Sequence, residues 1–117
     1  MHTVYLGLGA NLNAPRKQIH AAVAALKALK DVEFVCVSHD YASKPMGPQD
    51  QPDYVNAVAC VKTALKPEQL LDLTQAIELE HGRVRKEERW GPRTLDIDIL
   101  LFGNDVIDTP RLTVPHY

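Results

Sequence analysis

The stretch from Arg83 to Leu101, RVRKEERWGPRTLDIDILL, combines carboxylates and cations in a spacing that suits phosphate chemistry. Asp96 and Asp98 alternate with apolar residues, as they would in a β-strand, where side chains point to opposite faces with a period of two. Both carboxylates would then lie on one face, with their Cα atoms about 6.5 to 7 Å apart. Carboxylates held in this way can bind Mg²⁺ together with substrate phosphates and water. The stretch therefore predicts a phosphoryl-transfer site.

A group of cationic side chains and the single tryptophan precede the aspartates. The cations are Arg83, Arg85, Lys86, Arg89 and Arg93. Such side chains can neutralise the charge that develops on a transferred phosphoryl group, and the indole of Trp90 can stack on a flat heterocycle. Three structural alternatives stay open: a solvated charge run for the cations, a cover over the core for Trp90, and a solvated strand face for the aspartates.

The whole chain has 117 residues, of which 45% are hydrophobic, and a formal charge of -2. This length suits one domain with one core, and the slight acidity provides no general attraction to nucleic acids or membranes. Cys36 and Cys60 lie in apolar runs without metal-binding spacing, which predicts buried, reduced thiols. No leader precedes Thr3 and no apolar run reaches the length of a membrane span, which favours a cytoplasmic protein.

Hydrophobic periodicity and turn residues predict four strands and two helices. The expected strands are Thr3–Leu8, Val32–Val37, Tyr54–Val61 and Leu95–Leu101, and the expected helices begin at Pro15 and Pro67. The order strand, helix, strand, strand, helix, strand is that of the ferredoxin-like β-α-β-β-α-β arrangement. We therefore expect an α+β protein with an antiparallel sheet and helices packed on one face. The segment Ser38–Asp53 has no periodicity and predicts a long functional loop.

Tyr54 and Asn56 form a second pair at strand spacing. They offer a flat ring and an amide with both donors and acceptors, which suits a planar polar ring such as a purine or a pterin. A tyrosine that simply packs at the entrance of a strand is the structural alternative. The sequence contains no GxxxxGK[ST], GxGxxG, GxSxG or HExxH motif, which excludes a P-loop nucleotide enzyme at the level of motifs.

Several separate segments, in order from end to end, together resemble one family. They are LGLGANL, KPMGPQDQPDYVNA, QAIELEHGRVR, RWGPRTLDIDIL and RLTVPHY. The chain is similar in them to the 6-hydroxymethyl-7,8-dihydropterin pyrophosphokinases of folate biosynthesis. The resemblance implies a ferredoxin-like core with long active-site loops. It also implies Mg²⁺-dependent transfer of pyrophosphate from ATP to the pterin, with two Mg²⁺ ions and AMP as a product.

The same resemblance assigns residues by their position in the motifs. Asp96 and Asp98 would bind both metal ions, and Arg83 and Arg93 would stabilise charge on the transferred group. The pterin pocket would include Ser43, Pro45, Met46, Tyr54, Asn56 and Trp90. The ATP site would include Gln75, Glu78, Arg85, Arg89, Ile99, Arg111, Leu112, Thr113, His116 and Tyr117.

Family members continue beyond the VPHY motif, so we expect the single pyrophosphokinase domain, residues 1–117, to be incomplete at its C-terminus. The expected partners are ATP and the pterin, without nucleic acid or membrane, and the sequence assigns no oligomeric state. Two alternatives remain: a ferredoxin-like RNA-binding module, and a folded relative that retains only nucleotide binding. The absence of paired RNP-type aromatics and the negative charge disfavour the RNA-binding module.

Overall fold

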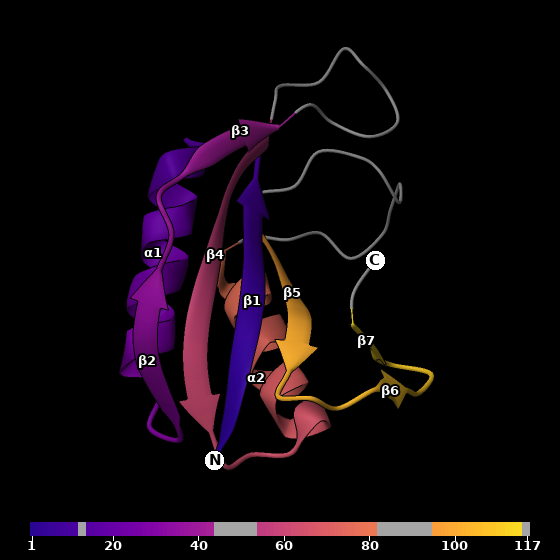
Figure 1. The fold of residues 1–117 in the computed structure, drawn as a ribbon. Helices are drawn as coiled ribbons and strands as arrows, with labels where there is room; N and C mark the ends of the chain where they lie inside the picture. Colours follow the sequence, from indigo (N-terminus) through magenta and orange to yellow (C-terminus); the bar gives the residue numbers. More distant parts are fainter. Residues whose placement is uncertain (12–13, 44–53, 82–94, 116–117) are drawn as a thin grey trace.

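The structure is a computed structural model that describes residues 1–11, 14–43, 54–81 and 95–115. For Ser43 it describes the backbone and not the side chain. In these ranges the chain has an α+β fold (Figure 1). The helices are α1 (Pro15–Ala28) and α2 (Pro67–Glu80). The strands are β1 (His2–Ala10), β2 (Val32–Val37), β3 (Tyr41–Ser43), β4 (Tyr54–Thr63), β5 (Asp96–Phe102), β6 (Ile107–Asp108) and β7 (Thr113–Val114).

The main sheet is antiparallel, with β2, β4, β1 and β5 side by side in that order and β3 paired with β4. Strands β6 and β7 form a separate two-stranded pair. The predicted α+β fold with an antiparallel sheet and two helices is confirmed. The prediction that Ser38–Asp53 is loop throughout is wrong, because Tyr41–Ser43 pairs with β4. A strand of three residues is too short to show alternation in the sequence, and only its pairing with β4 defines it.

The two helices begin where the sequence places them. Pro15 and Pro67 occupy the first turns of α1 and α2, where the missing proline N–H removes no helical hydrogen bond. Helix α2 is closed at its start by Gln69, whose Oε1 accepts a hydrogen bond from the backbone N–H of Lys66 at 2.9 Å. Helix α1 starts after Ala14, which has a φ of 59° and no side-chain cap.

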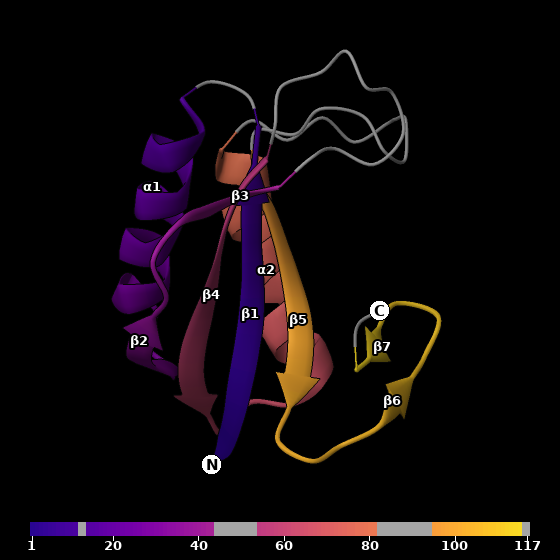
Figure 2. The ribbon, with the colours of Figure 1, turned by 45° about the horizontal axis from the view of Figure 1, so that its top comes forward.

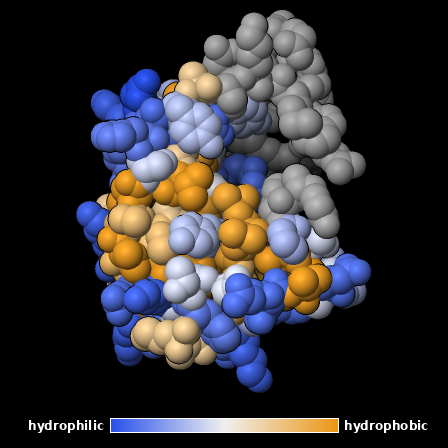
Figure 3. All heavy atoms as spheres, viewed as in Figure 1, coloured by the Kyte–Doolittle hydropathy of each residue, from blue (hydrophilic) through white to orange (hydrophobic). Residues whose placement is uncertain are grey.

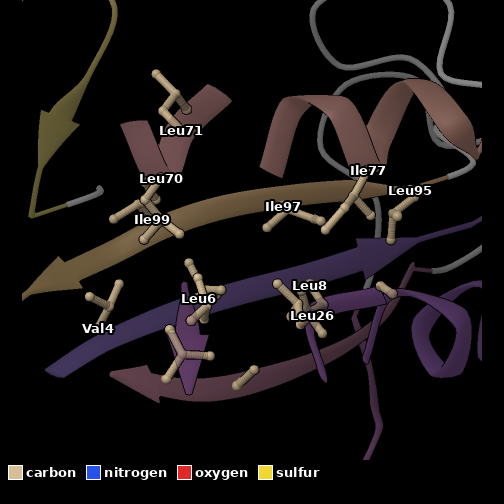
Figure 4. Close-up of a cluster of buried hydrophobic side chains, with 14 of the residues drawn as sticks. Val4, Leu6, Leu8, Leu26, Leu70, Leu71, Ile77, Leu95, Ile97 and Ile99 are labelled. Atoms are coloured by element: carbon tan, nitrogen blue, oxygen red, sulfur yellow. The ribbon is translucent and has the colours of Figure 1, made fainter. Parts of the chain in front are cut away.

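Both helices pack on the same face of the sheet, behind it in Figure 1, and Figure 2 shows the same layers from another angle. Helix α2 covers β5: Figure 4 shows Leu70 over Ile99, and Ile77 beside Ile97 and Leu95. These five side chains are at most 4% exposed. Each such side chain contributes roughly 1.5 to 3 kcal/mol through the removal of apolar surface from water.

The opposite side of the sheet has no helix over it among the described residues, and we call it the helix-free face. Figure 3 looks onto this face and shows apolar side chains gathered over its middle. Tyr5 and Leu101 are register partners and are 40% and 42% exposed. No helix in the described ranges is long and apolar enough to span a bilayer.

The cysteine prediction is half correct. Both thiols are free, and Cys60 on β4 is buried, but Cys36 on β2 is exposed. The apolar run around Cys36 indicated burial, whereas β2 lies at the edge of the described sheet. An edge strand has a neighbour on one side only, so its apolar residues do not all become buried.

Candidate active site

Asp96 and Asp98 lie on the helix-free face, at the start of β5. Ile97 and Ile99 are 4% and 2% exposed and pack under α2. Because side chains alternate along a strand, the two aspartates point to the other face, where both are partly buried. In the antiparallel register Asp96 lies opposite Gly9 of β1, and Asp98 lies opposite Gly7. Each carboxylate therefore has a residue without a side chain as its neighbour.

The two glycines of β1 have different surroundings: a Cβ atom added at Gly7 would lie 3.3 Å from Cδ2 of Leu100, so that side chain covers Gly7. A Cβ atom added at Gly9 would lie 3.3 Å from Oδ1 of Asn56 and 3.8 Å from Cδ1 of Tyr54. Asn56 is the register partner of Gly9 on β4, so Asn56, Gly9 and Asp96 form one row across three strands. Glycine in a strand interior often marks a close approach to the backbone. Neither glycine is among the site residues predicted from the sequence, although their alternation in LGLGA was the available signal.

Strand β3 extends this row by one residue. Tyr41 pairs with Asn56, and Ser43 pairs with Tyr54. Tyr41 is 52% exposed, whereas Tyr54 and Asn56 are partly buried. Tyr41 was predicted to lie in a loop, and its position beside Asn56 was not predicted. The site thus consists of Tyr54, Asn56, Gly9, Asp96 and Asp98, which we call the glycine corner.

Helix α2 supports the aspartates from behind through Glu78. This carboxylate is 3% exposed, and its Oε2 accepts a hydrogen bond from the backbone N–H of Ile97 at 2.7 Å. Ile97 lies between the two aspartates, and β5 is an edge of the described sheet. A buried backbone N–H requires an acceptor, and a carboxylate makes a strong one. Glu78 therefore holds the segment that carries Asp96 and Asp98.

Arg111, just before β7, binds the exposed side of α2. Its Nη2 donates to Oδ1 of Asp72 at 2.6 Å and to Oε1 of Gln75 at 3.4 Å, and its Nη1 donates to Oε1 of Glu68 at 3.4 Å. The hydrogen bond to Asp72 raises the pKa of Arg111, so the guanidinium stays charged. The structure thus brings together Gln75 and Arg111, two residues predicted for the ATP site.

The other predicted ATP-site residues in the described ranges have different environments. Ile99 and Leu112 are 2% and 8% exposed and belong to the core, so they can offer a ligand little more than backbone groups. Thr113 is exposed on β7. The remaining predicted residues lie outside the described ranges: Pro45, Met46, Arg83, Arg85, Arg89, Trp90, Arg93, His116 and Tyr117.

The oxygen donors at the glycine corner suit a hard cation. Within residues 1–11, 14–43, 54–81 and 95–115, no three or more His, Cys, Asp or Glu side chains gather into a metal site. Mg²⁺ does not need such a cage, because it is commonly held by one or two carboxylates plus substrate phosphates and water. The aspartate pair therefore fits Mg²⁺ better than it fits a structural Zn²⁺, which takes four protein ligands.

Comparison with known proteins places this arrangement in a family. The model of the 7,8-dihydro-6-hydroxymethylpterin-pyrophosphokinase family matches residues 5–117. The 2-amino-4-hydroxy-6-hydroxymethyldihydropteridine pyrophosphokinase of Haemophilus influenzae is 58% identical over 100% of this chain and 72% of that protein. Proteins of the same name from Pseudomonas aeruginosa and Pseudomonas putida are 59% and 54% identical, over 97% of this chain and 70% and 92% of their own lengths. The chain therefore belongs to the 7,8-dihydro-6-hydroxymethylpterin pyrophosphokinase family.

Proposed function

We propose that this chain transfers a pyrophosphoryl group from ATP to the hydroxymethyl group of 6-hydroxymethyl-7,8-dihydropterin, with AMP as the second product, in folate biosynthesis. Membership of the family and the names of the relatives support this activity. The structural observation that carries it is the glycine corner, where Asp96 lies in one row with Gly9 and Asn56, and Asp98 shares the face of Asp96. This arrangement offers a place for phosphate-bound metal next to a place for a polar ring.

We propose that Asp96 and Asp98 hold two Mg²⁺ ions. Their carboxylates share one face, and Gly9, opposite Asp96, places no side chain between Asp96 and Asn56. When bound there, Mg²⁺ would neutralise charge on the ATP phosphates and polarise the phosphorus–oxygen bonds. The protein's own task is to keep both carboxylates in place, and the hydrogen bond from Ile97 to Glu78 does so from the core side.

The pterin side of the proposal rests on Tyr54, Asn56 and Gly9. The Asn56 amide has donors and acceptors that can pair with the polar edge of a pterin, and the ring of Tyr54 offers a flat contact. Gly9 lets a ring approach the backbone beside Asn56. Ser43 is the register partner of Tyr54. Ser43, Pro45, Met46 and Trp90 complete the proposed pocket on the strength of the family resemblance.

The ATP side rests on Gln75 of α2 and on Arg111, which donates a hydrogen bond to it. A guanidinium that stays charged is suited to phosphate binding. The roles proposed for Glu78, Ile99, Leu112 and Thr113, and for Arg85, Arg89, His116 and Tyr117, follow from the resemblance. So do the charge-stabilising roles of Arg83 and Arg93.

The proposed reaction forms one phosphorus–oxygen bond and breaks one. The hydroxymethyl oxygen bonds to the β-phosphorus of ATP, while the bond from that phosphorus to the oxygen shared with the α-phosphorus breaks. AMP leaves with this oxygen, and the hydroxyl proton is released. Catalysis of such a transfer consists mainly of alignment and charge stabilisation. Rigid placement of the aspartates on the sheet serves the alignment.

We further propose that the core is ferredoxin-like. The order β2, β4, β1, β5 in an antiparallel sheet, with both helices on one face, supports this assignment. We also place the enzyme in the cytoplasm, where ATP is abundant, and propose ATP and the pterin as its partners. No role for nucleic acid is included in the proposal.

Product analysis tests the proposed function directly. With ATP, Mg²⁺ and the hydroxymethyl-dihydropterin present together, the chain should release AMP and form pterin diphosphate, and ADP as the nucleotide product would refute pyrophosphoryl transfer. Asp96→Asn and Asp98→Asn should lower turnover at least about a hundredfold without loss of fold. Asp105→Asn, in an exposed turn, is the matched control. Normal turnover in either aspartate variant would exclude the metal assignment, and nucleotide binding without transfer would identify a relative that only binds.

A further inference from the structure

The two cysteines of this chain are direct neighbours across strands β2 and β4. In the antiparallel register Cys36 pairs with Cys60, although the two are separated by several structural elements in the sequence. The pairing depends on a register shift between Phe34 and Cys36, which makes Val35 an extra residue on β2. Without that β-bulge, Val35 would lie opposite Cys60 and Cys36 would lie opposite Ala59. The bulge therefore brings the two thiols together.

Both thiols point to the helix-free face. Cys60 also pairs with Tyr5 of β1, and the residues on either side of Tyr5, Val4 and Leu6, are fully buried in the core. Tyr5 and its partner Cys60 therefore face away from the helices, and Cys36 shares their side because directly paired residues of antiparallel strands do so. Cys36 is exposed, whereas Cys60 is 9% exposed. A soluble oxidant can reach Cys36 first.

The register pairing of Cys36 with Cys60 is compatible with the span of a disulfide. Directly opposed residues of antiparallel strands have Cα atoms about 4.5 to 5.5 Å apart, and disulfides span Cα distances of about 4.4 to 6.8 Å. We propose that Cys36 and Cys60 form a redox-modifiable pair that closes into a disulfide between β2 and β4. The structure holds both as free thiols, which is the form that an oxidant would act on.

A small disulfide such as oxidised glutathione is the oxidant in this proposal. The Cys36 thiolate attacks one glutathione sulfur, forms a mixed disulfide and displaces one reduced glutathione. The Cys60 thiolate then attacks the Cys36 sulfur and displaces the second. In total the protein loses two protons and two electrons, and one oxidised glutathione becomes two reduced molecules.

The disulfide would lock the edge of the sheet and leave the glycine corner intact. Cys60 is four residues from Asn56 along β4, about 13 Å in an extended strand. The bond instead joins the edge strand β2 to its only neighbour in the described sheet. Oxidation should therefore raise the thermal unfolding midpoint, by about 10 to 15 °C for a loop of this length.

The test is oxidation of the folded chain by oxidised glutathione, followed by intact-mass spectrometry after blocking of the remaining thiols. The expected product is a monomer that has lost two hydrogen atoms, takes up no blocking reagent and returns to two thiols on reduction. Cys36→Ser should prevent both the closure and the rise in the unfolding midpoint. Cys60→Ser should stop the reaction at the glutathione adduct of Cys36.

A shifted pair serves as the matched control. The control variant combines Cys36→Ser with Glu33→Cys. The new cysteine lies opposite Lys62, and its Cα atom is diagonal to that of Cys60 at about 7 to 8 Å. This distance is beyond the ordinary reach of a disulfide. This variant should close at least about tenfold more slowly. Equal rates in both proteins, a stable glutathione adduct in the parent chain, or disulfide-linked dimers as the main product would each overturn the proposal.

Discussion

Replacement of Glu78 by alanine should destabilise the strand that carries the aspartates. The change removes the acceptor of the Ile97 N–H, a 2.7 Å hydrogen bond in a buried setting, and an unsatisfied buried N–H costs about 1 to 3 kcal/mol. The lost side-chain methylenes add about 1 to 2 kcal/mol. Relief from burying a carboxylate offsets part of this loss. We expect the free energy of unfolding to fall by about 2 to 4 kcal/mol.

Urea unfolding followed by circular dichroism measures the free energy of unfolding, and hydrogen exchange of the Ile97 amide reports the local effect. Glu78→Gln keeps an oxygen acceptor and loses the charge, so we expect a smaller loss of about 1 kcal/mol. Glu80→Ala, on the exposed side of the same helix, is the matched control and should stay within about 0.5 kcal/mol of the parent chain.

The same substitution should affect the site. Because Ile97 lies between the two aspartates, Glu78→Ala should weaken Mg²⁺-dependent binding of an ATP analogue more than Glu80→Ala does. Unchanged stability together with unchanged exchange of the Ile97 amide in Glu78→Ala would refute the supporting role of Glu78. A loss of stability with normal exchange at Ile97 would locate the role of this carboxylate elsewhere.

Further predictions concern the ligand sites and the ion pairs of Arg111. Gly9→Ala should change the free energy of unfolding by no more than about 1 kcal/mol. It should weaken pterin binding at least tenfold in calorimetric titration, because the added Cβ would crowd Asn56. Unchanged affinity would contradict the role of Gly9 in pterin binding. Asp72→Asn should tighten binding of an ATP analogue by about two- to fivefold, and Arg111→Met should weaken it. The hydrogen bond to Asp72 raises the pKa of Arg111. The contribution of Arg111 to the free energy of unfolding is therefore complete below the ordinary pKa of arginine and is lost only as the pH rises through the raised pKa. The stability difference between Arg111→Met and the parent chain should thus be constant from neutral to mildly alkaline pH, and a change within that range would contradict this assignment.

The sequence by itself determined the features that depend on local pattern. Pro15 and Pro67 mark the helix starts because proline fits the first turn, and alternation in DIDIL places Asp96 and Asp98 on one face because strand side chains have a period of two. The sequence also indicated the family, because separate motifs of that family occur in the correct order along the whole chain. The helix starts and the facing of the aspartates depend only on residues that are close together in the chain, and the family depends on the order of the motifs.

The tertiary structure alone decided which distant residues meet. Strand register places Gly9 between Asn56 and Asp96, and helix packing brings the Glu78 carboxylate to the N–H of Ile97. Neither contact leaves a periodic signal, because register and packing are set by the whole core and not by adjacent residues. The bulge at Val35 is the sharpest case, since one extra residue changes which side chain of β2 lies opposite Cys60. A one-residue shift reverses the facing of a strand, and only the folded sheet fixes it.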